Sequence, residues 1–204
     1  MTVIEVFAEL GCPFTHVGLW RLVERRSTDG RDDLVLRVRA WPLELVNGMP
    51  LDPALIDEEV AELREQVAPD LFAHFDPARF PTSSLPALDL AAVAYGRGLQ
   101  EGERASLLLR DALFERGRPV GDPDVLEEIA AAVGIPVPGD EARAQVLADW
   151  HEGQARGVIG SPHFFLGADS WFCPSLDIKR VDGHLLIRSD PHAFEAFIDH
   201  CLSV

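Results

Sequence analysis

The sequence predicts an α/β protein in which a β-α-β segment and a later β-β-α segment form one split domain around a large all-helical insertion. Three observations predict this class. Strand-like stretches flank one helix within residues 1–52, residues 53–156 have almost purely helical periodicity, and strand patterns return within residues 157–204 before a last helix. We therefore expect the first and last of these ranges to form the α/β domain and the middle one to form an inserted helical domain.

The first segment predicts a strand, a turn and a helix that lead to a second, parallel strand. Residues 2–10 alternate apolar and polar side chains in the manner of a strand, and the pattern stops at Gly11. A helix then begins with Pro13, whose missing N–H costs nothing at the first helical position. Residues 34–41 form the second strand, which Pro42 ends.

The insertion carries the spacing and the end signals of helices. Asp122 and Pro123 supply an N-cap and a first-position proline, and Gly134 stands where a helix ends in the left-handed conformation. The apolar stripes of these helices are typical of core packing. Five helices are predicted, over residues 54–68, 84–97, 101–116, 122–133 and 141–154.

Strand patterns return in the last part of the chain. Residues 163–166 predict one strand, and residues 178–187 predict a hairpin with its tight turn at Asp182-Gly183. A final helix begins at Asp190-Pro191. Its apolar face consists of Phe194, Phe197, Ile198, Cys201 and Leu202.

Composition and charge exclude several classes of function. With 47% hydrophobic residues and a mean hydropathy of +0.05, the 204-residue chain can bury a core. Lys and Arg number 18 and Asp and Glu 34, and the resulting net charge of -16 repels nucleic acids and anionic membrane surfaces. No apolar stretch has the length of a membrane helix, and the N-terminus lacks the pattern of a secretory signal. We expect a cytoplasmic protein that binds neither nucleic acid nor membrane.

The three cysteines, Cys12, Cys173 and Cys201, have no regular spacing, so they predict neither a disulfide framework nor a metal ribbon. Cys12 and His16 have the spacing of half a metal site, but no second pair at ligand spacing accompanies them. We expect no bound metal.

Cys12 has the sequence position of a reactive thiol. It follows a strand directly as the N-cap of a helix, where the first N–H groups and the helix dipole stabilise a thiolate. Thr15 lies about one turn further along, so its hydroxyl can donate a hydrogen bond to the sulfur. The alternative is a buried small apolar residue, since cysteines are among the most buried residues.

Motifs around the predicted insertion carry a resemblance. CPFT at residues 12–15 follows the first strand, PLEL at 42–45 follows the second, DALFERG at 111–117 lies in the insertion, and GVIGSPHF at 157–164 leads into the third strand. In this order they resemble the DsbA-like thioredoxin superfamily, and above all its cytoplasmic branch of FrnE-type oxidoreductases and 2-hydroxychromene-2-carboxylate isomerases. The resemblance covers nearly the whole chain and implies a thioredoxin-like fold.

The resemblance also implies roles for individual residues. Cys12 matches the exposed nucleophilic cysteine, and Pro162 matches a cis proline that faces the sulfur, although from the residues alone a trans bond is the expectation. Ser161 precedes that proline, and its backbone would pair with a bound thiol or peptide. The remaining residues expected to bind the thiol are Pro13, Phe14 and His16.

The chain departs from the dithiol members of that superfamily at Thr15, where they keep a second cysteine. Cys12 therefore cannot close a disulfide within the motif. In one remaining chemistry, Cys12 forms a mixed disulfide that a small cellular thiol resolves. In the other, the site resembles isomerase and transferase members that bind or activate glutathione or another low-molecular-weight thiol. A non-catalytic binding module is the third alternative. No permanently bound cofactor is expected, and a homodimer stays open.

Three further residues complete the predictions. His16 is either a proton carrier that lowers the pKa of the thiol when charged, or a solvent-facing residue of the first helical turn. Cys201 lies on the apolar face of the last helix, so we expect it to be buried. The position of Cys173 relative to Cys12 does not follow from the sequence, and a resolving role for it stays open.

Overall fold

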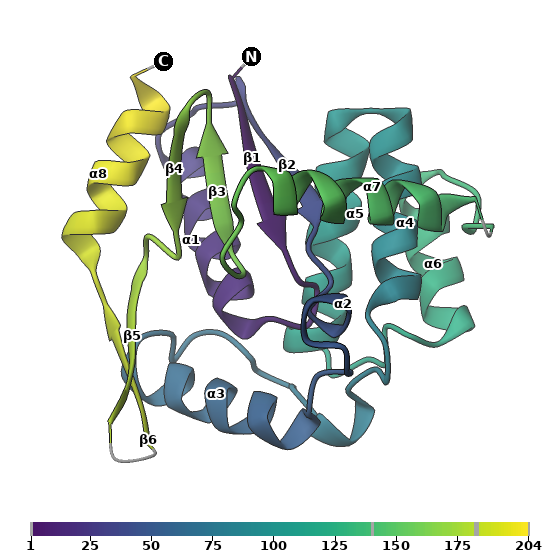
Figure 1. Cartoon of the computed structure of the whole chain (residues 1–204), viewed down its shortest axis with the longest axis horizontal. Coiled ribbons are helices and arrows are strands. Elements are labelled where there is room, and N and C mark those ends of the chain that lie inside the picture. Colours follow the sequence, from purple (N-terminus) through teal and green to yellow (C-terminus); the bar gives the residue numbers. More distant parts are fainter. Residues whose placement is uncertain (1, 140, 182–183, 204) are drawn as a thin grey trace.

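A computed structural model describes residues 2–139, 141–181 and 184–203 of the chain (Figure 1). Its main sheet has the strand order β2-β1-β3-β4. β1 (Thr2–Ala8) pairs parallel with β2 (Leu34–Ala40) and antiparallel with β3 (His163–Leu166), which pairs antiparallel with β4 (Asp169–Phe172). The β1-α1-β2 part is the predicted β-α-β segment, and β3 is the predicted third strand.

The central strand β1 is buried on both faces. On one face, Ile4 and Val6 share an apolar cluster with side chains of α1 (Pro13–Thr28) and α8 (Pro191–Leu202). On the other face, the Phe7 ring meets Trp41 and Phe165 in a second cluster. Alternate residues of a strand point to opposite faces, so this burial requires apolar residues at successive positions. Cys201 lies in the first cluster and is 0% exposed, which confirms its predicted burial.

The insertion is helical, as predicted, and two short elements were not predicted, one before residue 53 and one within the insertion. The helix expected over residues 101–116 divides into an α-helix and a π-helical turn at Asp111–Glu115. The helix at Leu43–Asn47 and the 3-10 turn at Pro77–Arg79 are too short to show periodicity. The α-helices are α2 (Leu43–Asn47), α3 (Pro53–Gln66), α4 (Leu85–Arg97), α5 (Leu99–Arg110), α6 (Pro123–Val133) and α7 (Ala142–Ala155).

Helices of the insertion cover the free edge of β2. The hydroxyl of Tyr95 in α4 accepts a hydrogen bond from Val38 N at 2.7 Å and donates one to Leu36 O at 3.0 Å. Glu103 of α5 accepts a hydrogen bond from Leu36 N at 2.6 Å. An edge strand exposes unpaired backbone groups, and these side chains satisfy them.

Charged side chains hold α7 against the sheet and thereby place the loop that precedes β3. Arg39 Nη1 of β2 donates to Asp149 Oδ1 at 3.0 Å and to Glu152 Oε2 at 2.7 Å. Close approach also requires Gly153, because a Cβ there would lie 2.6 Å from the Trp41 ring. The loop of residues 157–162 is therefore anchored at its start by α7 and at its end by β3.

The end of the chain corrects one prediction. The strand that pairs with β3 is β4, which was not predicted, and Gly167 in the left-handed conformation (φ 61°) lies at the turn between them. The predicted hairpin forms as β5 (Leu176–Val181) and β6 (His184–Ser189), but it is a separate two-stranded sheet. Its turn at Asp182-Gly183 lies outside the described residues. The short, mostly exposed β4 lacks the apolar pattern that predicts strands.

The separate hairpin and α3 lie together at one end of the main sheet (Figure 1). Ile187 N of β6 donates a hydrogen bond to Gln66 Oε1 at the end of α3, at 3.1 Å. One large apolar cluster joins this end to the insertion: it contains Leu10 and Phe14 together with buried residues of α3 to α6. The division at residues 52/53 and 156/157 stays a prediction. Within the described part of the chain, no helix is long and apolar enough to cross a membrane.

Candidate active site

Cys12 lies at the N-terminus of α1, where β1 ends. Its side chain is 5% exposed and shares an apolar cluster with Ile56 and Val60 of α3. Gly11 beside it packs so closely that a Cβ would lie 2.6 Å from the Phe80 ring. The expectation of an exposed cysteine is therefore wrong in this conformation, because α3 and the segment that follows it pack over the start of α1.

The thiol of Cys12 faces the loop that precedes β3. Its Sγ donates a hydrogen bond to Ser161 O at 3.4 Å. The hydroxyls of Thr15 and Ser161 share a hydrogen bond of 2.7 Å, and Ser161 Oγ also accepts one from Glu9 N at 2.8 Å. Cys12 and Thr15 of the CPFT motif therefore lie beside Ser161 of the GVIGSPHF motif.

The Ser161-Pro162 peptide bond is cis, as the resemblance implies. Pro162 lies against α1, since a Cβ placed on Gly18 would be 3.8 Å from Pro162 Cγ. On its other side, Pro162 O accepts a hydrogen bond from Cys173 N at 3.0 Å. The loop at residues 161–162 thus stands between the start of α1 and the residue that follows β4.

Burial raises the pKa of the Cys12 thiol above its usual value of 9.0, because apolar surroundings disfavour the thiolate. Hydrogen bonding by Thr15 acts in the opposite direction, and the negative charge of Glu59 adds to the rise in pKa. The predicted stabilisation of a thiolate is therefore outweighed here. In this conformation Cys12 is a neutral thiol that donates its hydrogen to Ser161 O.

Pro13 and Phe14 are buried in the same conformation. Pro13 occupies the first position of α1, as predicted. Phe14 is 9% exposed and belongs to the large apolar cluster that also contains Cys12. Their predicted contact with a thiol would require the start of α1 to become more accessible than it is here.

Comparison with protein families identifies the chain. The sequence profile of the DSBA-like thioredoxin domain matches residues 3–185. The chain belongs to this family. The family bears out the resemblance that the CPFT and GVIGSPHF motifs indicated, and with it the thioredoxin-like fold. A search of curated proteins finds no match.

Several solved structures share the fold of this DSBA-like thioredoxin domain at low sequence identity. A 2-hydroxychromene-2-carboxylate isomerase is 16% identical with a TM-score of 0.63, over 83% of this chain and 88% of the isomerase chain. The cytosolic disulfide reductase DsbM from Pseudomonas aeruginosa is 15% identical with a TM-score of 0.62, over 98% of each chain. The structure of DsbM with GSH is 15% identical with a TM-score of 0.59, over 99% of this chain and 100% of DsbM. At these identities, the likeness shows the fold alone.

In this DSBA-like thioredoxin domain, His16 lies on a different face of α1 from Thr15. Its side chain is buried, its Nε2 lies 2.6 Å from Glu115 Oε1, and its ring packs against Phe114 at 4.9 Å. Burial lowers the pKa of His16 below its usual 6.5, against the opposing effect of Glu115. The solvent-facing alternative is wrong, and a neutral His16 supplies no positive charge that would lower the pKa of Cys12.

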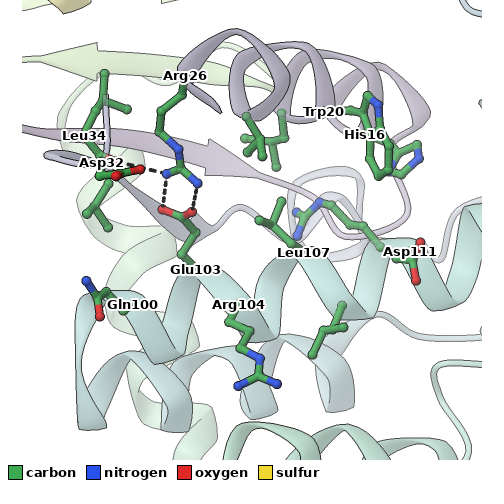
Figure 2. A pocket seen from close by; sticks show the side chains of 15 residues that line it. His16, Trp20, Arg26, Asp32, Leu34, Gln100, Glu103, Arg104, Leu107 and Asp111 are labelled. Carbon is green, nitrogen blue, oxygen red and sulfur yellow. Dashed lines mark hydrogen bonds and ion pairs between the residues drawn. The ribbon is translucent and has the colours of Figure 1, made fainter. Parts of the chain in front are cut away.

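A cavity of about 550 Å³ lies between α1 and α5, on the His16 face of α1 (Figure 2). Apolar side chains such as Leu19 and Leu107 line it, and the ion pair of Arg26 with Glu103, at 2.6 Å, spans part of its wall. The volume is typical of sites for small molecules. Among the described residues that line it, none belongs to the Cys12, Thr15 and Ser161 group.

Three charged residues that build the site were not predicted from the sequence. Glu9 is 0% exposed, and its carboxylate accepts hydrogen bonds from Gly11 N at 3.0 Å and from Leu43 N at 2.8 Å. Arg110 is 1% exposed and donates to Glu9 O at 3.1 Å. A glutamate within the predicted strand of residues 2–10, three residues before Cys12, was the available signal for Glu9. Arg110 and Glu115 lie far from Cys12 in the chain, and the DALFERG motif that contains Glu115 did not indicate a role for it.

Proposed function

We propose that the protein is a cytoplasmic thiol-disulfide oxidoreductase in which Cys12 forms mixed disulfides with small disulfides such as oxidised glutathione. The observation that carries this proposal is the contact of Cys12 Sγ with Ser161 O, beside the cis peptide bond to Pro162. The family and the cytosolic disulfide reductase DsbM among the structural neighbours support the class of reaction. The cytosolic location that the name of DsbM states supports the proposed location.

The reaction is an exchange that conserves atoms and electrons. The Cys12 thiol loses its proton, its sulfur bonds to one sulfur of the substrate, and the substrate S–S bond breaks. The second sulfur leaves as a thiolate and takes up a proton, so one thiol is released and one mixed disulfide remains. Thr15 stabilises the reacting thiolate by donating its hydroxyl hydrogen, since hydrogen bonds to charged groups are the stronger ones.

The substrate reaches Cys12 only after the cover over the start of α1 opens. That cover consists of α3 and the segment up to Phe80, which pack on Cys12 and Gly11. The hydrogen bond of Gln66 to Ile187 N ties α3 to β6. We therefore propose that movement of α3 away from the sheet end exposes the thiol.

The test is intact-mass spectrometry and peptide mapping after exposure to oxidised glutathione. We expect a glutathione adduct on Cys12 that reduced thiol removes, and no adduct at that position in the Cys12→Ser variant. Cys201→Ser is the matched control, because Cys201 is equally buried but lies in another apolar cluster. Equal labelling of the Cys12→Ser and Cys201→Ser variants would disprove the role of Cys12.

A second candidate function is that of a glutathione-dependent isomerase or transferase. It is favoured by the neutral state of Cys12, because a thiol that donates a hydrogen bond can bind the sulfur of another thiol. The hydroxyls of Thr15 and Ser161 lie beside it and offer further hydrogen bonds. The isomerase and the GSH-bound reductase among the structural neighbours support this candidate as well.

Covalency separates the two candidates. Saturable binding of reduced glutathione in calorimetry, together with no adduct from oxidised glutathione, would favour the isomerase or transferase. An adduct on Cys12 would favour the oxidoreductase. A protein that shows neither would fit the non-catalytic binding module.

A further inference from the structure

Cys173 lies beside the loop that Cys12 contacts. It follows β4 directly, and its N–H donates to Pro162 O at 3.0 Å, while Cys12 Sγ donates to Ser161 O at 3.4 Å. The two cysteines therefore form hydrogen bonds to consecutive residues of one loop, although they lie 161 positions apart in the chain. No motif spacing indicates this neighbourhood.

The two side chains also share one environment. Cys173 is 4% exposed and belongs to the same apolar cluster as Cys12, together with Leu176 and Ile187 of the β5-β6 hairpin. Burial, and after it the charge of a Cys12 thiolate, raises the pKa of Cys173 to about 12. Cys201 is buried just as completely, but it packs in the other cluster beneath α8. Of the two remaining cysteines, only Cys173 shares the surroundings of Cys12.

We propose that Cys173 is the resolving thiol of this protein and closes an intramolecular disulfide with Cys12. The proposal rests on the proposed function, because it begins from a mixed disulfide on Cys12. It gives the chain a substitute for the second cysteine that Thr15 replaces in the CPFT motif. The protein is then a dithiol enzyme whose two cysteines come from different segments.

The resolving step is balanced as written. The sulfur of Cys173 bonds to the sulfur of Cys12, the bond between Cys12 and the small thiol breaks, and the small thiol leaves with the proton that Cys173 loses. Over both steps, one small disulfide is reduced to two thiols while two protein thiols are oxidised to one disulfide. Two equivalents of a reduced thiol such as glutathione restore the starting state by the reverse exchange.

The backbone at Cys173 lies outside the residues that pair β3 with β4. Cys173 has a φ of 46°, in the left-handed region that residues other than glycine rarely adopt, and it lies in the short connection between β4 and β5. A disulfide requires Cα atoms within about 7 Å and correctly directed Cβ atoms. The proposal includes a change of backbone angles in this connection that turns the Cys173 side chain toward Cys12, and the residues that pair β3 with β4 end at Phe172.

Peptide mapping under non-reducing conditions tests the proposal. The full chain is treated with oxidised glutathione, quenched with acid, and mapped in the wild type and in the Cys173→Ser and Cys201→Ser variants. We expect a linked Cys12–Cys173 peptide in the wild type and in Cys201→Ser. In Cys173→Ser, the glutathione adduct on Cys12 should accumulate on the order of tenfold above its wild-type level, because the intramolecular step is absent.

The outcomes separate this inference from the function on which it rests. An adduct on Cys12 that persists equally in the wild type and in Cys173→Ser would overturn the resolving role and leave the monothiol oxidoreductase standing. A linked peptide of Cys12 with Cys201 would also overturn it. No adduct and no linked peptide in any protein would overturn both. The wild-type map alone is decisive, so the test does not depend on the folding of the Cys173→Ser variant.

Discussion

Two faces of α1, the thiol face with Cys12 and the cavity face with His16, differ in chemistry and in exposure to solvent. One face carries Cys12 and Thr15, which are held with Ser161 by hydrogen bonds between neutral groups under a cover of α3. The other face carries His16, which bonds to Glu115 and lines an open cavity of about 550 Å³. The cavity therefore lies on the face that does not carry Cys12, and none of the described residues that line it is a cysteine. This separation teaches that the cavity alone does not locate the proposed reactive thiol.

A buried hydrogen-bond chain connects the two faces. Arg110 lines the cavity and donates to Glu9 O, and Glu9 N donates to Ser161 Oγ on the thiol face. Burial lowers the pKa of Arg110 to about 10, which still leaves it charged at neutral pH. A change on the cavity face can therefore reach Ser161 through Glu9, the residue that follows β1.

The largest expected effect concerns the reactivity of the thiol face. In a Cys173→Ser, Cys201→Ser double variant, only Cys12 remains to react with iodoacetamide. Because its pKa lies above 9.0, we expect the alkylation rate to rise about tenfold per pH unit from pH 7 to 9, in step with the thiolate fraction. The alkylation rate is measured by mass spectrometry. A rate that levels off near pH 7 would show that the Cys12 thiol is not neutral at that pH.

The next effect is on stability. Ser161→Ala removes the acceptor of Glu9 N and the partner of the Thr15 hydroxyl, and both are buried. We expect the free energy of unfolding to fall by about 1–3 kcal/mol in urea titrations, because a buried donor is left without a partner. Ser203→Ala, at an exposed position, is the control and should change it by less than about 0.5 kcal/mol. Equal losses of stability in Ser161→Ala and Ser203→Ala would show that the buried hydrogen bonds of Ser161 do not stabilise the protein more than an exposed serine does.

On the cavity face, the expected effect is a dependence of stability on pH. The pKa of His16 is lowered by burial, so the folded protein binds a proton less readily than the unfolded chain does. Stability is therefore full above pH 6.5 and falls as the pH decreases below that value. The hydrogen bond of His16 and two backbone amides hold the pKa of Glu115 below 4.5 despite burial, which adds a loss at lower pH.

Thermal unfolding followed between pH 7 and 5 measures this dependence. The His16→Asn variant should show a shallower decrease of Tm with falling pH than the wild type, because the titrating ring is gone. His192→Asn, on an exposed side chain of α8, should leave the wild-type slope unchanged. An unaltered slope in His16→Asn would contradict the buried, neutral state of His16.

The smallest effect tests how tightly the thiol face packs. A Cβ at Gly18 would lie 3.7 Å from Ser175 Oγ and 3.8 Å from Pro162 Cγ, which are ordinary contacts. Gly18→Ala should therefore raise the free energy of unfolding by about 0.5–1 kcal/mol, as expected inside a helix. Gly96→Ala in α4, where a Cβ meets no atom within 4 Å, is the matched control. A loss of stability in Gly18→Ala alone would mean that α1 lies closer to the cis-proline loop.

Local patterns predicted much of the fold because they act over short distances in the chain. The alternation in β1, the first-position proline of α1 and the caps of α6 each depend on a few neighbouring residues. The hairpin was predicted as a pair of strands, but its separation from the main sheet was not. That outcome depends on how β4 fills the edge beside β3, and β4 has no apolar pattern of its own.

By itself, the sequence determined the order of the longer strands and helices, the cysteine at the N-cap of α1, and the absence of a second cysteine from the CPFT motif. The tertiary structure decided that α3 covers Cys12, that His16 bonds to Glu115, and that Cys173 lies beside Pro162. The physical reason is that hydrogen-bond periodicity is local, whereas burial, and the pKa shifts that follow from it, depends on segments far apart in the chain.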